Sequence, residues 1–228
     1  MGQSMRPGLP AGPRFEERGM DSIIFDVDGT LWDSRASVTR SWNRAVEEVL
    51  GVPGTLTARE LGRQFGKTMI DIMVDLFPGI PPEQAQALSA RCFQVELDRL
   101  EEDPGVLFPG VAETLPRLCR RVPLYIVSNC QCGYIDALLR VCGFENYFSG
   151  FLCWEDTGLP KSGTLRTLME RYSLKDSVYV GDTQGDADQC ALAGIPMIWA
   201  AYGFGEVKAP KQTIRRFSDL LSLPELAK

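Results

Sequence analysis

Two aspartates separated by one residue, Asp26 and Asp28, have a spacing that could support chemistry. They stand at the end of an apolar, β-branched run over residues 22–27, where an open α/β sheet presents its ligand-binding side chains. Side chains two apart in a strand share a face, so the carboxylates repel each other unless a cation or a proton lies between them. The pair therefore indicates either a metal site or a nucleophile with an acid–base partner. Gly29 then permits a sharp turn, and Thr30 adds a hydroxyl.

Polar side chains also follow three other predicted strands, and each could contribute to the same site. They are Ser128 with Asn129, Lys161, and Asp182 with Asp186. Because the carboxyl ends of the strands in a doubly wound sheet lie along one edge, we expect these side chains to meet Asp26 there. Taken singly, each has an ordinary structural alternative, such as a turn, a helix N-cap or a solvated lysine. Their occurrence at four strand ends together favours a functional site.

The elements that must position these residues alternate between short apolar runs and stretches of helical period. Strands are predicted over residues 22–27, 123–128, 150–153, 177–181 and 195–200. Helical stripes fall between them, over residues 111–119, 135–142 and 165–172. This alternation predicts an α/β fold with a Rossmann-like parallel sheet and helices on both faces.

The first two predicted strands are much further apart in the chain than the later ones. The segment between them carries only helical patterns, and Pro and Gly residues mark its return to the strands. We therefore expect an inserted all-α domain over residues 35–104 and an α/β core made of residues 20–34 and 105–228. Residues 1–19 are rich in Pro and Gly and have no periodic apolar face, which predicts a disordered leader.

The composition excludes several function classes. The chain contains no histidine, which removes histidine-based triads and histidine-ligated zinc. The formal net charge is −6 and no basic run occurs, so nucleic-acid binding lacks its electrostatic footprint. No apolar run approaches the roughly 18 residues that a membrane-spanning helix needs. Seven cysteines without CxxC spacing, and no secretory signal before them, favour reduced thiols and a cytoplasmic location.

Together these motifs resemble those of a known superfamily. The segment Asp26-Val27-Asp28-Gly29-Thr30, Ser128, Lys161 and the segment from Gly181 to Asp186 resemble the four motifs of the haloacid dehalogenase-like hydrolases, in order and in spacing. The helical insert resembles the cap domain of that superfamily, and Leu31-Trp32-Asp33-Ser34 resembles its phosphoglycolate phosphatase-like branch. The resemblance implies a Mg²⁺-dependent phosphomonoester hydrolase that acts on a small phosphorylated metabolite. It would use no nucleic-acid or membrane partner and would be a monomer or a homodimer.

The resemblance also implies a role for each motif residue. Asp26 would attack phosphorus to form an aspartyl-phosphate, and Asp28 would protonate the leaving alcohol and then activate water. The groups implied for Mg²⁺ are Asp26, the backbone carbonyl of Asp28, and Asp182, with Asp186 and Thr30 behind these ligands. The groups implied for the phosphoryl oxygens are Ser128, the Asn129 backbone and Lys161.

Other reactions stay open on the residues alone. In a phosphosugar mutase of the β-phosphoglucomutase type, the same aspartyl-phosphate would pass to another hydroxyl instead of water. A non-catalytic protein that binds a phosphorylated ligand would also keep these residues. A dehalogenase or a phosphonate-cleaving enzyme is disfavoured, because those branches do not carry an acid at the position of Asp28.

The insert offers one candidate for substrate selection, Lys67, in the Gly66-Lys67 loop between two predicted helices. The cap of the superfamily often reaches into the active site at such a loop. The structural alternative is a plain loop before a helix, with Thr68 as its N-cap.

Overall fold

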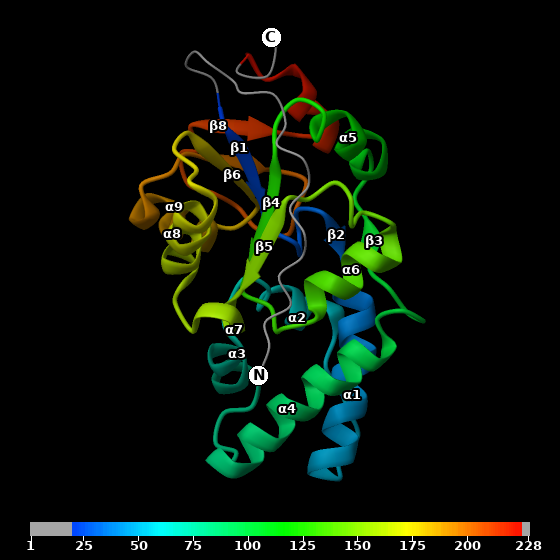
Figure 1. Cartoon of the computed structure of the whole chain (residues 1–228). Helices are drawn as coiled ribbons and strands as arrows, with labels where there is room; N and C mark the ends of the chain where they lie inside the picture. The colour runs from blue at the N-terminus through cyan, green and yellow to red at the C-terminus, as the bar shows by residue number, and fades with distance from the viewer. Residues whose placement is uncertain (1–19, 225–228) are drawn as a thin grey trace.

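The computed structural model describes residues 20–224, so the leader predicted over residues 1–19 lies outside the described residues. The main body is a six-stranded sheet in which every neighbouring pair of strands is parallel (Figure 1). The strand order is β5-β4-β1-β6-β7-β8. The strands are β1 (Ser22–Phe25), β4 (Leu124–Ser128), β5 (Gly150–Cys153), β6 (Ser177–Gly181), β7 (Met197–Ala200) and β8 (Gln212–Ile214). This order confirms the predicted parallel α/β fold and places β1 inside the sheet.

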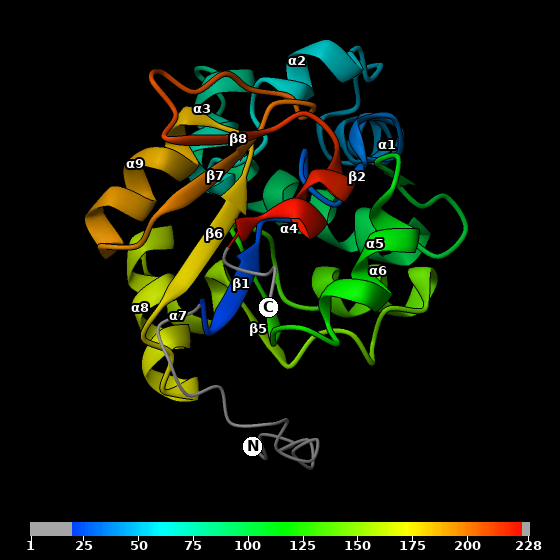
Figure 2. The same ribbon diagram turned by 90° about the horizontal axis from the view of Figure 1, so that it is seen from above.

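Helices cover both faces of the sheet, as predicted (Figure 2). On one face lie α8 (Lys161–Tyr172) and α9 (Gln184–Ala193), and on the other lie α5 (Val111–Leu118) and α6 (Tyr134–Cys142). A short helix, α7 (Trp154–Thr157), follows β5, and a 3-10 helix, Phe217–Ser222, packs against α5. The helices α5, α6 and α8 bury leucines such as Leu115, Leu138 and Leu165 against the sheet, as amphipathic helices do.

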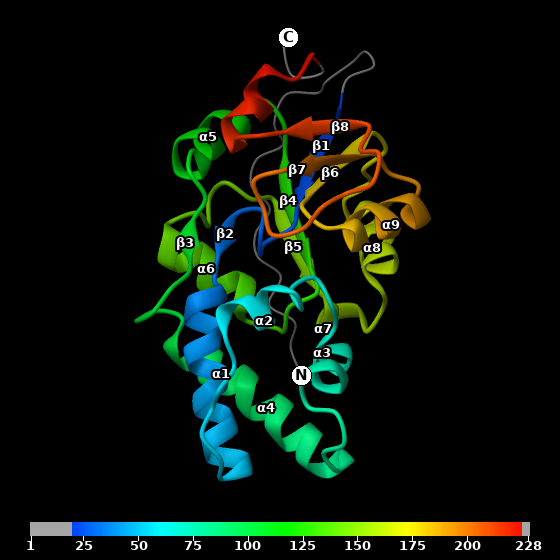
Figure 3. The same cartoon turned by 180° about the vertical axis from the view of Figure 1, so that it is seen from behind.

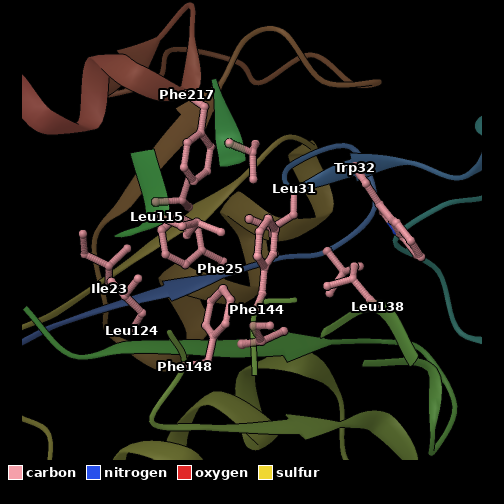
Figure 4. Packing of buried hydrophobic residues seen from close by; sticks show 14 of the residues in the cluster. Ile23, Phe25, Leu31, Trp32, Leu115, Leu124, Leu138, Phe144, Phe148 and Phe217 are labelled. Atoms are coloured by element: carbon pink, nitrogen blue, oxygen red, sulfur yellow. The ribbon is translucent and has the colours of Figure 1, made fainter. Parts of the chain in front are cut away.

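β1 supplies side chains to both layers, because successive residues of a strand point to opposite faces. Ile23 and Phe25 join the cluster on the side of α5 and α6, whereas Ile24 joins the cluster on the side of α8. The ring of Phe25 lies edge-on to Phe148, with 6.2 Å between ring centroids, and 5.6 Å from the ring of Phe217 (Figure 4). Burial on both faces explains why Ile23, Ile24 and Phe25 of β1 are all apolar.

The segment between β2 (Trp32–Asp33) and β3 (Val106–Leu107) forms four helices beyond the carboxyl edge of the sheet (Figures 1 and 3). They are α1 (Arg35–Leu50), α2 (Ala58–Gly62), α3 (Met69–Leu76) and α4 (Pro82–Arg99). These helices enclose a hydrophobic cluster of their own, which includes Val38, Trp42 and Leu88. β2 and β3 pair in antiparallel fashion, so the two connections to the core form one ribbon. The separate cluster supports an inserted all-α domain, whose limits at residues 35 and 104 stay a prediction.

The five predicted strands are confirmed, although β1, β4 and β7 are shorter than expected. Sequence reasoning missed β2, β3 and β8, because strands of two or three residues are too short to show an alternating pattern. Within residues 20–224, no helix combines the length and the apolar character needed to cross a membrane.

Candidate active site

The carboxyl edge of the sheet brings together residues that are far apart in the chain. Asp26 follows β1, Ser128 ends β4, and Asp182 follows β6. Lys161 begins α8, directly after its N-cap residue Pro160. Because β1 lies between β4 and β6, these side chains gather at the centre of the edge.

Lys161 is buried between two aspartates. Its Nζ lies 3.1 Å from Oδ1 of Asp26 and 2.6 Å from Oδ1 of Asp186, and all three side chains are at most 4% exposed. Burial alone would lower the pKa of Lys161, but the charges of Asp186 and Asp26 outweigh it and hold the pKa above its ordinary value. Burial raises the pKa of Asp26, although the ammonium of Lys161 opposes this shift. Lys161 therefore remains a cation in contact with Asp26.

Asp186 has donors on both of its carboxylate oxygens. Oδ1 accepts from Lys161, while Oδ2 accepts from the backbone N–H of Thr183 at 3.0 Å and from its hydroxyl at 2.7 Å. Burial favours the neutral acid, but the charge of Lys161 and the donors outweigh it, so the pKa of Asp186 is lowered. Asp186 is thus an ionised group that fixes Lys161 and caps the first turn of α9.

Asp182 has one carboxylate oxygen with donors and one without. Oδ2 accepts hydrogen bonds from the backbone N–H groups of Phe204 at 2.7 Å and Gly205 at 3.3 Å. Oδ1 is buried and has no hydrogen-bond partner among the described residues. Burial, followed by the negative charges of Asp186 and Asp26, raises the pKa of Asp182 to about 8. A buried carboxylate oxygen in this position is costly unless a cation or a proton binds it.

These carboxylates fit a divalent cation. One oxygen from each of Asp26, Asp182 and Asp186 lies within 4.8 Å of the others. When ionised, the three acids carry two more charges than Lys161 can balance, and Mg²⁺ takes oxygen ligands of this type. The loop after β1 approaches Asp182 closely at Gly29, whose φ is +84°. A residue with a Cβ at this position would collide with the Asp182 carboxylate, so the close approach requires glycine. The donor set and its charge thus suit a divalent cation such as Mg²⁺.

The carboxylate of Asp28 is oriented by three donors that sequence reasoning did not assign. Its Oδ1 accepts hydrogen bonds from Ser34 at 2.5 Å, from the hydroxyl of Tyr134 at 2.9 Å and from the indole of Trp32 at 3.1 Å. Oδ2 receives none from residues 20–224, and Asp28 lines a pocket together with Asp26. Burial raises the pKa of Asp28 to about 6, although the three donors oppose the shift. Tyr134 lies on α6, too far along the chain for a local pattern to reveal.

The residues predicted to bind phosphate or to support the metal include Ser128, Asn129 and Thr30. Ser128 and Asn129 line the same pocket as Asp26. The side-chain amide of Asn129 donates to the carbonyl of Gly66 at 2.7 Å, which links the loop after β4 to the helical insert. Thr30 is fully buried, and its hydroxyl has no hydrogen-bond partner among the described residues. The roles of these residues stay predictions.

Lys67 lines the pocket, but its ammonium is bound within the insert. Nζ donates to Asp75 at 2.5 Å and to Gln64 at 2.9 Å. Thr68 is the N-cap of α3 and accepts from the backbone N–H of Asp71, as the structural alternative predicted. The role of Lys67 in substrate selection stays a prediction.

Sequence reasoning missed Glu96, an acid in the wall of the same pocket. It belongs to α4 in the insert and is only 6% exposed. Its Oε2 accepts from the indole of Trp42 at 2.8 Å, and its Oε1 from the amide of Gln131 at 3.4 Å. The sequence signal that could have indicated Glu96 is its position one helical turn after Cys92, on the buried stripe of α4.

The fold and the site define a class of protein, a parallel α/β hydrolase that presents an aspartate beside a buried lysine. The family model of the haloacid dehalogenase-like hydrolases matches residues 23–200, and the chain belongs to this family. It is 25% identical over 238 residues to the phosphoglycolate phosphatase of Escherichia coli K12, covering 91% of this chain and 93% of that protein. It is 28% identical over 230 residues to the phosphoglycolate phosphatase of Yersinia pestis, covering 92% and 96%. The chain is therefore an enzyme of the phosphatase type.

Solved structures share the same fold. A predicted phosphoglycolate phosphatase from Haemophilus somnus superposes with a TM-score of 0.76 and 22% identity, covering 89% of this chain and 97% of that one. A mutant of CbbY from Rhodobacter sphaeroides, in complex with xylulose 1,5-bisphosphate, superposes with a TM-score of 0.75 and 18% identity, covering 91% and 99%. These likenesses confirm the α/β fold.

Proposed function

We propose that the protein is a Mg²⁺-dependent phosphomonoesterase that releases phosphate from a small phosphorylated metabolite. The observation that carries this proposal is the position of Asp26, 3.1 Å from Nζ of Lys161 and within 4.8 Å of oxygens of Asp182 and Asp186. A carboxylate can act as a covalent nucleophile toward phosphorus. The ammonium on one side and an acidic cluster suited to a cation on the other would draw a phosphoryl group onto this carboxylate.

Asp26 and Asp28 would share the two chemical steps. Asp26 attacks phosphorus, and the bond from phosphorus to the alcohol oxygen breaks as the aspartyl-phosphate forms. Asp28 gives its proton to the departing oxygen through Oδ2, while Trp32, Ser34 and Tyr134 hold Oδ1 in place. Asp28 then takes a proton from the water that attacks the aspartyl-phosphate, which releases phosphate and restores both acids.

The metal would be held by Asp26, Asp182 and the backbone carbonyl of Asp28, with Asp186 and Thr30 behind these ligands. Bound Mg²⁺ supplies positive charge that offsets the repulsion between a carboxylate nucleophile and an anionic phosphate. The unpartnered Oδ1 of Asp182 supports this assignment, because a cation would satisfy it. Asp186 has donors on both oxygens, which suits a supporting position.

Three further groups would hold the phosphoryl oxygens. The ammonium of Lys161 lies against Asp26, while Ser128 and the backbone of Asn129 stand at the end of β4 in the same pocket. Donors fixed in this way stabilise the charge that spreads over the phosphoryl oxygens in the transition state. Residues 35–104 would act as a cap over a core made of residues 20–34 and 105–228, and the bond from Asn129 to Gly66 supports contact between them.

The test is phosphate release from phosphoglycolate, hexose and pentose phosphates, nucleotides and p-nitrophenyl phosphate, with Mg²⁺ or with EDTA. We expect metal-dependent turnover that is lost in Asp26→Asn and kept in the control Asp188→Asn, an exposed acid on α9. Phosphate release that survives Asp26→Asn, or none from any ester, would contradict the proposal. Conversion of β-glucose 1-phosphate to glucose 6-phosphate faster than phosphate release would instead indicate a mutase.

A further inference from the structure

The pocket beside Asp26 and Asp28 continues into the helical insert. Its far wall is mostly apolar and includes Val38, Trp42, Met69, Ile72 and Phe93. With the phosphoryl group at Asp26, the alcohol part of a substrate would lie against this wall. The few polar groups of the wall therefore decide which alcohols are accepted.

Glu96 is a buried acid in this wall that has no basic partner. It accepts hydrogen bonds from two neutral groups, the indole of Trp42 at 2.8 Å and the amide of Gln131 at 3.4 Å. No lysine or arginine within residues 20–224 forms a salt bridge with it. Buried glutamates are rare unless they are paired. Burial and the negative charge of Asp28 raise the pKa of Glu96 to about 7, so this end of the pocket disfavours further negative charge.

The lysines near the pocket do not offset Glu96. The ammonium of Lys67 binds Asp75 at 2.5 Å, inside the insert. The ammonium of Lys161 is held by the aspartates at the edge of the sheet. The described residues that line the pocket include Lys67 and no other basic side chain. A carboxylate on the alcohol part of a substrate would thus approach Glu96 and Asp28 with no free cation to pair with.

We propose that Glu96 selects phosphate esters whose alcohol part ends in a hydrogen-bond donor, a hydroxyl or an ammonium group, and rejects those that end in a carboxylate. The inference rests on the proposed phosphatase function and narrows its substrate class. A donor would complete the hydrogen bonding of Glu96, because the 3.4 Å bond from Gln131 is long. The chain would then differ in preference from the phosphoglycolate phosphatases that it resembles, since phosphoglycolate carries a carboxylate.

Three two-carbon phosphate esters that differ only at the end remote from phosphate test this selection. They are 2-hydroxyethyl phosphate, 2-aminoethyl phosphate and 2-phosphoglycolate, assayed with the full chain and Mg²⁺ at pH 8. We expect kcat/KM for the better donor-bearing ester to exceed that for 2-phosphoglycolate by at least about tenfold, because like charges brought together in a buried site repel. The faster of the hydroxyl and ammonium esters identifies the donor.

Two matched variants assign the effect to Glu96. Glu96→Gln removes the charge and keeps the shape of the side chain. The ratio of kcat/KM for the better donor-bearing ester to that for 2-phosphoglycolate should therefore fall at least about tenfold. Glu83→Gln, an exposed acid at the start of the same helix, should keep the wild-type preference. Thermal unfolding checks that both variants fold. If Glu96→Gln does not fold, the wild-type preference among the three esters alone tests the inference.

The outcomes separate the inference from the proposed function. Hydrolysis of 2-phosphoglycolate as fast as the donor-bearing esters overturns the inference and leaves the phosphatase function standing. An unchanged preference in a folded Glu96→Gln overturns it as well. If neither these esters nor p-nitrophenyl phosphate is hydrolysed, the proposed function fails and the inference fails with it.

Discussion

Nζ of Lys161 lies 3.1 Å from Oδ1 of Asp26, and both side chains are buried. One ammonium can therefore hold the proposed nucleophile in place and also receive the phosphoryl oxygens that approach it. Because the same ammonium binds Asp186 at 2.6 Å, it is also a structural element of the edge of the sheet. Under the proposed mechanism, catalysis and stability would thus depend on the same cation.

Lys161→Met should lose activity and stability together. Without the ammonium, Asp26 and Asp186 are left buried and unpaired, which typically costs about 3–5 kcal/mol. Loss of a charge-stabilising donor should lower kcat/KM by at least about 100-fold. Denaturant unfolding in EDTA and steady-state kinetics measure the two effects, with the exposed Lys211→Met as the control. A Lys161→Met protein as stable as the wild type would contradict the proposed contribution of Lys161 to stability.

Asp182→Asn should abolish stabilisation by Mg²⁺. In the wild type, Mg²⁺ at 100 times its Kd should add about 2.7 kcal/mol to the free energy of unfolding, because it binds the folded state. The variant loses the buried carboxylate whose Oδ1 has no other partner among the described residues. Thermal unfolding with Mg²⁺ or EDTA measures the difference, and Asp188→Asn on α9 should behave as the wild type does. An undiminished Mg²⁺ shift in Asp182→Asn would remove Asp182 from the metal ligands.

The contribution of Asp182 to stability should fall as pH rises in EDTA. Its pKa is about 8 in the folded protein and 3.8 in its ordinary state, so the folded chain binds more protons between these values. Stability declines with pH wherever the folded state holds the extra proton. In EDTA, Asp182→Asn should therefore be more stable than the wild type at pH 8, and the gap should close toward pH 5. Thermal unfolding across this range tests the sign, and a constant gap would contradict it.

Tyr134→Phe should impair the acid–base role of Asp28. The tyrosine hydroxyl donates to Oδ1 of Asp28 at 2.9 Å, and a hydrogen bond to a charged group is worth about 1.5–3 kcal/mol. We expect kcat/KM to fall about tenfold, because a tenfold change corresponds to about 1.4 kcal/mol. The donor favours the ionised acid, so its loss should also raise the pKa of Asp28. Because Asp28 must be protonated to give its proton to the leaving oxygen, the alkaline limb of the pH profile of kcat/KM should move upward. Tyr147→Phe, on a partly buried tyrosine after α6, should change neither. If Tyr134→Phe lowered activity only by disturbing the packing, the pH dependence of kcat/KM would not change.

The sequence was sufficient for the parts of the molecule that depend on local pattern. Buried parallel strands carry unbroken apolar runs, such as Ile23-Ile24-Phe25 in β1, and polar residues such as Asp26 and Asp182 follow the strands directly. The edge strand β8 has three residues and pairs only with β7, so its place depends on the tertiary fold rather than on its own pattern. The sequence pattern therefore predicted every strand of four or more residues, including the edge strand β5, and missed the three-residue β8.

The groups around the acids could not be predicted in the same way. Tyr134 reaches Asp28 from 106 residues away, and Glu96 meets Gln131 across 35 residues. No motif spacing encodes such contacts. The first depends on how α6 packs against the loop after β1, and the second on how the insert packs against the core. The sequence does give one indication of Glu96, because an acid on an otherwise apolar helical stripe departs from the pattern of a buried face. Such departures are expected at functional positions.

The selectivity proposed for Glu96 should itself depend on pH. With a pKa of about 7, Glu96 becomes ionised between pH 6 and pH 8, and the ionised form is the one that repels a carboxylate. The ratio of kcat/KM for 2-hydroxyethyl phosphate to that for 2-phosphoglycolate should therefore rise with pH over this range. Tyr134 and Cys92, the other titratable groups close to Glu96 besides Asp28, have raised pKa values and stay neutral throughout.

Taking a ratio isolates Glu96 from the rest of the site. Both esters react through Asp26 and Asp28 and carry the same phosphate, so the effect of titrating these groups on the chemical steps cancels in the ratio. The carboxylate of 2-phosphoglycolate is ionised at every pH used. In Glu96→Gln the ratio should be lower and independent of pH, whereas Glu83→Gln should keep the wild-type curve. A wild-type ratio that stays flat from pH 6 to pH 8 would show that the charge of Glu96 does not control the choice of alcohol. A slope that persists in Glu96→Gln would assign the effect to Asp28, the other acid that faces the alcohol part of the substrate.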